Sequence, residues 1–185
     1  MRQIRSRHPG FREAVLADCK VTSQFRGERS EFRSKPDAVL RAIRLAWVSD
    51  AFLAQIFYRA KAAMQACGIP VLPRLAHRAS MILAQVSIGD PVVMHPGVYI
   101  VHGQVVLDGI VEIHSGTLIS PWVTIGLRAG HVVGPRVMHG VNIGTGAKLI
   151  GEIKVGADSR IGANAVVVGD VPTGVTVVGV PAHPV

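Results

Sequence analysis

The stretch VMHGVNIGTGAKLIGEIKVGADSRIGANAVV, residues 137–167, carries an aliphatic side chain at every sixth position. These side chains belong to Val137, Ile143, Leu149, Val155, Ile161 and Val167. A strict period of six fits neither an α-helix, with about 3.6 residues per turn, nor a flat strand, which alternates every two residues. It is typical of a parallel β-helix, in which each hexapeptide forms one side of a coil and its aliphatic residue points into the stack.

The same period continues towards the N-terminus through further apolar residues, which are Ile88, Met94, Ile100, Leu107, Ile113, Ile119 and Ile125. It is interrupted twice. Seven residues instead of six lead from Ile100 to Leu107, and residues 126–136 contain no clean hexapeptide. We expect one extra residue to bulge from the coil at the first interruption and an irregular loop at the second.

The 185 residues divide unevenly in charge. Residues 1–85 hold fifteen Lys and Arg against six Asp and Glu, whereas residues 86–185 hold five against six. We predict four segments: a basic N-terminal arm over 1–34, an α-helical region over 35–85, the β-helix over 86–171, and a C-terminal cap over 172–185.

Three helices are expected before the repeats. A weak amphipathic pattern predicts a helix from Gly10 to Phe25. A wide apolar pattern predicts a second helix, with Asp37 as its N-cap and Gly68 as its end. A third helix is predicted from Leu72 to Leu83.

The basic arm suggests a solvated surface or, as an alternative, peripheral contact with an anionic membrane surface. No nucleic-acid-binding motif accompanies the arginines, so no nucleic acid is expected. The two cysteines have no metal or redox spacing and favour a reducing compartment. Without a secretory signal or a long apolar segment, a cytoplasmic location is expected, with the inner face of the membrane as a further possibility.

From about Leu40 to Ala182 the chain resembles the serine acetyltransferases, within the wider hexapeptide-repeat acyltransferases. The resemblance rests on Ile88-Gly-Asp-Pro, Tyr99-Ile-Val-His102-Gly, residues 141–151, residues 161–168, and Gly179-Val-Pro-Ala182. It implies a left-handed β-helix, a homotrimer or a multiple of it, and acetyl transfer from acetyl-CoA to a hydroxyl group.

The resemblance also implies a catalytic residue at the first interruption, where the family carries an Asp-His pair. His102 matches the histidine, the general base that deprotonates the acceptor hydroxyl, while Val101 replaces the aspartate. A neutral imidazole is available near pH 7 to accept that proton. A backbone carbonyl, Asp108 or Glu112 are alternatives for orienting the ring.

The second interruption departs from the family. There the family's loop ends in Arg-His-Pro, whereas Val133 and Gly134 precede Pro135 here, and Ile110 replaces a family glutamate. Because a serine carboxylate needs a paired cation, we predict a changed acceptor, a sugar hydroxyl of a surface polysaccharide or its precursor. The acceptor-site candidates are Arg128, His131 and Arg136. Two alternatives remain: a serine acetyltransferase with a rebuilt carboxylate clamp, and a catalytically silent β-helix scaffold.

For acetyl-CoA, the resemblance implies that pantetheine lies along a groove between coils, held mainly by backbone amides. The matching positions are Thr145, Gly146, Ala163, Gly179, Pro181 and Ala182. No metal site is predicted, because His131 and His139 are eight residues apart and form no close pair.

Overall fold

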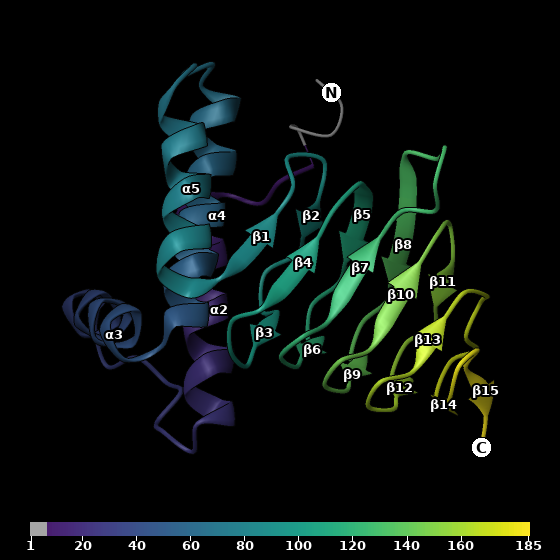
Figure 1. Cartoon of the computed structure of the whole chain (residues 1–185). Helices are drawn as coiled ribbons and strands as arrows, with labels where there is room; N and C mark the ends of the chain where they lie inside the picture. The colour runs from purple at the N-terminus through teal and green to yellow at the C-terminus, as the bar shows by residue number, and fades with distance from the viewer. Residues whose placement is uncertain (1–6) are drawn as a thin grey trace.

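The hexapeptide period folds into a left-handed parallel β-helix, as the sequence predicts (Figure 1). The computed structural model describes residues 7–185. The first four coils each contribute one strand to each of three sheets, which we call A, B and C in the order in which the chain visits them. The coil is therefore triangular in cross-section, and it has a corner wherever the chain passes from one sheet to the next.

The strands are two to five residues long, as expected for one side of such a coil. Sheet A contains β1 (Val86–Ile88), β4 (Val105–Leu107), β7 (Thr124–Gly126), β10 (Lys148–Ile150) and β13 (Val166–Val167). Sheet B contains β2 (Val93–Met94), β5 (Ile110–Ile113), β8 (Val133–Val137) and β11 (Lys154–Val155). Sheet C contains β3 (Tyr99–Ile100), β6 (Leu118–Ile119), β9 (Asn142–Ile143), β12 (Arg160–Ile161), β14 (Thr176–Val178) and the antiparallel β15 (His183–Pro184).

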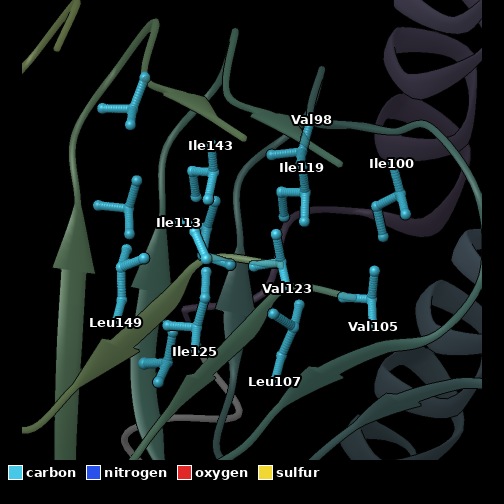
Figure 2. Packing of buried hydrophobic residues seen from close by; sticks show 14 of the residues in the cluster. Val98, Ile100, Val105, Leu107, Ile113, Ile119, Val123, Ile125, Ile143 and Leu149 are labelled. Carbon is cyan, nitrogen blue, oxygen red and sulfur yellow. The ribbon is translucent and has the colours of Figure 1, made fainter. Parts of the chain in front are cut away.

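The aliphatic residues of the period form one continuous core (Figure 2). All of them, from Ile88 to Val167, are at most 3% exposed. Equivalent residues of successive coils are paired in register, for example Leu107 with Ile125 and Ile119 with Ile143. Burial of each such side chain stabilises the fold by about 1.5–3 kcal/mol.

Both interruptions lie where the sequence places them. Residues 101–104 form the bulge between β3 and β4, and this bulge packs against the C-terminal end of α5 (Leu72–Ala84). A Cβ on Gly103 would meet the Ala84 carbonyl oxygen at 2.2 Å, so only glycine fits there. The second interruption forms the loop 127–132 between β7 and β8, with an irregular register between Ile110 and Glu112 on β5.

Within residues 7–185 the helical layer contains α2 (Phe11–Phe25), α3 (Lys35–Val48), α4 (Asp50–Ala66) and α5. Helices α2, α4 and α5 pack against the first coil, whereas α3 packs against α2 and α4 on the side away from the strands (Figure 1). The prediction of one helix from Asp37 to Gly68 was wrong. The segment divides at Ser49, whose hydroxyl accepts a hydrogen bond from the Phe52 amide and so starts a new helix. The predicted helices near 10–25 and 72–83 are confirmed.

The N-terminal segment is not a free basic arm, because α2 packs into the helical layer. Ala14, Asp18 and Cys19 on α2 are fully buried. Asp18 forms an ion pair of 3.0 Å with Arg59 of α4. Among the arginines of the predicted arm, Arg2 and Arg5 lie outside the described residues. In the described part of the chain, no helix is both long and apolar enough to cross a bilayer.

Candidate functional site

His102 lies in the bulge at the corner between sheets C and A, with its side chain exposed. The bulge contacts two consecutive residues at the C-terminal end of α5. Gly103 lies against the Ala84 carbonyl, and the Gln104 side-chain amide donates a 2.7 Å hydrogen bond to the Gln85 side chain. A fixed backbone therefore presents an exposed imidazole to solvent.

Neither carboxylate considered from the sequence lies beside His102. Asp108 follows β4 and lies at the opposite end of sheet A from the bulge. Glu112 projects from sheet B, where its Oε1 is 3.1 Å from His95 Nε2. The hypothesis that Asp108 or Glu112 of the same chain orients His102 is therefore wrong.

The positions matched to pantetheine lie along the same corner as His102, on later coils. The Asn164 amide donates to the Thr145 carbonyl at 2.8 Å, and the Ala182 amide donates to the Val166 carbonyl at 2.9 Å. Thr145 and Ala163 are exposed there. These hydrogen bonds align the segments 145–146, 163–164 and 179–182 along one edge of the triangular β-helix.

A repeated backbone conformation shapes this corner. Left-handed φ angles recur in four successive coils, at Gln104 (57°), Trp122 (65°), Gly146 (76°) and Asn164 (55°). A left-handed φ is uncommon for a residue as bulky as tryptophan, so the tight turn between sheets C and A dictates it. The indole of Trp122 is 60% exposed on the coil that follows His102.

The acceptor-site candidates lie elsewhere, along sheet B and the loop before it. Arg136 lines a groove of about 350 Å³. The same groove contains Ile110, Val133 and Gly134, the positions at which the chain departs from the family. Arg128 and His131 line a hollow of about 140 Å³, which shares Glu152 and Ile153 with the groove.

In a triangular coil, sheet B lies opposite the corner between sheets C and A. Figure 1 shows the turn from β3 to β4 and the loop from β7 to β8 at opposite ends of sheet A. One chain therefore brings the three acceptor candidates into adjoining hollows but keeps them apart from His102.

Glu112 is the electrostatic centre of the groove. Its Oε2 is 2.7 Å from Arg7 Nη2 and 3.2 Å from Arg136 Nε. Burial opposes ionisation, but hydrogen bonds from Arg7 and His95 outweigh it and lower the pKa of Glu112 to about 2. The lining as a whole is balanced, with three basic and three acidic residues: Arg7, Arg136, Lys154, Glu112, Glu152 and Asp170.

The depressed pKa of Glu112 predicts that the stability of the fold depends on pH. Because the folded pKa of Glu112 is depressed, its contribution to stability is present above the unfolded value of 4.5 and is lost as pH falls towards about 2. Glu112→Gln should therefore cost up to about 3 kcal/mol at pH 6 and progressively less below pH ~4.5. Urea unfolding of both proteins between pH 6 and pH 2.5 measures the difference, and a pH-independent gap would contradict the assignment.

Sequence reasoning missed Arg7, His95 and Glu112 as members of one site. The available signal was the coil length. His95 and His114 are nineteen residues apart, which is three hexapeptides plus the one bulged residue, so the β-helix places them side by side. No residue pattern in the N-terminal segment indicates that Arg7 reaches this sheet.

The chain is similar in sequence to known proteins. A serine acetyltransferase of Synechococcus elongatus is 39% identical over 119 residues, which cover 62% of this chain and 48% of the relative. A serine acetyltransferase of Mycobacterium tuberculosis is 43% identical over 120 residues, which cover 63% of this chain and 52% of the relative. This chain thus spans about half the length of the curated relatives that it matches. No family model matches it.

The three-dimensional structure is similar over almost the whole chain. A solved serine acetyltransferase in complex with CoA has a TM-score of 0.79 and 26% sequence identity. The matched region covers 99% of this chain and 73% of that chain. The similarity includes the helical layer as well as the β-helix.

Proposed function

We propose, on the premise that this chain is a serine acetyltransferase-like member of the hexapeptide-repeat acyltransferases, that it transfers an acetyl group from acetyl-CoA to a hydroxyl group. One observation carries the proposal. His102, which lies in the bulge between β3 and β4, is on the same edge of the β-helix as the positions matched to pantetheine. A base and a thioester aligned on one edge suit acyl transfer.

The corner suits a narrow, flexible ligand such as pantetheine. A Cβ on Gly146 would meet Asn164 Oδ1 at 2.0 Å, so position 146 has no room for a side chain. Small residues at 146 and 163 let a ligand approach the backbone closely. His102 Nδ1 or Nε2 accepts the hydroxyl proton as the acceptor oxygen attacks the thioester carbonyl, and the CoA thiolate leaves.

L-Serine is the acceptor that we propose in place of a sugar. The saccharide predicted from the sequence has no support, whereas the relatives are named serine acetyltransferases. The groove on sheet B supports the same choice, because a zwitterion needs both signs of charge. Arg136 and Glu152 both line this groove. In the proposal, Arg136 pairs with the serine carboxylate and Glu152 with its ammonium group.

The proposed site needs two subunits, because His102 and the groove lie on opposite sides of one chain. We therefore expect a homotrimer, in which His102 of one subunit faces the groove of its neighbour. Light scattering should give three times 19.7 kDa, about 59 kDa, or a multiple of it. An active monomer of about 20 kDa would contradict the shared site.

An acceptor panel tests the substrate. Purified protein is mixed with acetyl-CoA and either L-serine, serinol, which lacks the carboxylate, or a set of sugars, and free CoA thiol is recorded. We expect L-serine to react at least ~10-fold faster than serinol, because a lost charged pair costs about 1.5–3 kcal/mol. A sugar that reacts faster than serine would restore the saccharide hypothesis, and no thiol release with any acceptor would favour the scaffold.

A further inference from the structure

Three side chains with metal-binding atoms converge on the outer face of sheet B. His95 follows β2, while Glu112 and His114 lie on and after β5. Because Met94 pairs with Ile113 in neighbouring strands, the two histidines lie side by side, with ring centroids 4.4 Å apart and planes within 15°. The three ligand atoms all lie within 4.8 Å of one another.

The spacing matches a coordination sphere. Glu112 Oε1 is 3.1 Å from His95 Nε2 and 3.5 Å from His114 Nε2. Ligand atoms around a tetrahedral ion with bonds of about 2.1 Å are separated by about 3.4 Å. The two distances from Glu112 to the histidines therefore lie within about 0.3 Å of this separation.

One ligand atom lacks a partner. His114 Nε2 is buried, and it makes no hydrogen bond with any residue of the described part of the chain, 7–185. A buried polar nitrogen without a partner is costly, and a bound ion would satisfy it.

Two arginines set the strength of such a site. Arg7 and Arg136 contact Oε2 of Glu112, whereas the histidines face Oε1, so the oxygen required by an ion is not taken by a guanidinium. The arginines fix the carboxylate in position. Their positive charge also opposes a dication, which limits the affinity.

We infer that His95, Glu112 and His114 form a binding site for a divalent transition-metal ion of the Zn²⁺ class. Two imidazole nitrogens and one carboxylate oxygen are the donor set that Zn²⁺ takes in sites that keep an open position. Because Glu112 also lines the groove on sheet B, the ion lies at the wall of that groove. This inference does not depend on acetyl transfer.

Zinc binding to the full chain tests it directly. Protein stripped with a chelator is titrated with ZnCl₂, and bound zinc is measured by equilibrium dialysis. We expect one ion per chain at micromolar zinc, and we expect His114→Ala and Glu112→Gln each to weaken binding by at least ~10-fold. His139→Gln is the matched control, because His139 is exposed outside the cluster and should leave zinc affinity unchanged.

Arg136→Gln gives a readout that does not depend on removing a ligand. Loss of a positive charge beside Glu112 should raise zinc affinity several-fold, whereas zinc held elsewhere on the chain would not respond. Absence of stoichiometric zinc, or equal affinity in wild type, His114→Ala and Arg136→Gln, would overturn the inference.

Discussion

Replacement of His102 by asparagine should lower turnover by about 100-fold or more and leave acetyl-CoA affinity unchanged. Asparagine is close to histidine in size and polarity but cannot accept a proton from the acceptor hydroxyl. The His102 side chain is exposed, and the contacts of Gly103 and Gln104 with the end of α5 do not involve it. The fold should therefore not change. Steady-state CoA release gives kcat, and calorimetry gives the affinity for CoA.

Two companion variants sharpen this test. His139→Asn removes an exposed histidine at the corner between sheets B and C and should retain normal turnover. Val101→Asp restores the carboxylate that the family carries beside its histidine, and it should raise turnover or leave it unchanged. If His102→Asn keeps near-normal turnover, the base lies elsewhere, and His131 is the next candidate.

Replacement of Asp18 by alanine should destabilise the protein by about 3–5 kcal/mol, because it leaves a buried guanidinium without its counter-charge. Asp18 and Arg59 have side chains that are 1% and 2% exposed. Asp18 Oδ1 also accepts the Gly97 amide at 2.8 Å, which ties α2 to the first coil. Urea unfolding at a fixed protein concentration measures the loss.

Glu31→Ala is the matched control for this ion pair. Glu31 pairs with Lys20 at 3.1 Å, but their side chains are 79% and 45% exposed, so the change should cost less than about 1 kcal/mol. An equally small cost for Asp18→Ala would show that α2 is loosely attached, as a free basic arm would be.

The β-helix could be predicted in detail because its stability is local and repetitive. Each hexapeptide must bury one aliphatic residue against the coil on either side, so the pattern is visible along the chain itself. The bulge was also visible, because the spacing of seven from Ile100 to Leu107 is one residue more than a six-residue side requires. The position of His102 therefore followed from counting residues.

The helical layer and the groove on sheet B could not be predicted in the same way. Burial of the Asp18–Arg59 pair joins residues 41 positions apart, and a charge pattern alone makes such residues look exposed. From the sequence, Arg136 and His102 were assigned to one active site, although they lie on different sides of the β-helix. Only the order of sheets A, B and C around the coil reveals this separation.

The most direct test of acetyl transfer is the identity of the product. Purified protein is incubated with acetyl-CoA and L-serine, and the mixture is analysed by mass spectrometry beside the His102→Asn variant. We expect the wild type to form O-acetylserine in step with free CoA, and the variant to form it at least ~100-fold more slowly. Unmodified serine with intact acetyl-CoA, or equal product from both proteins, would contradict this expectation.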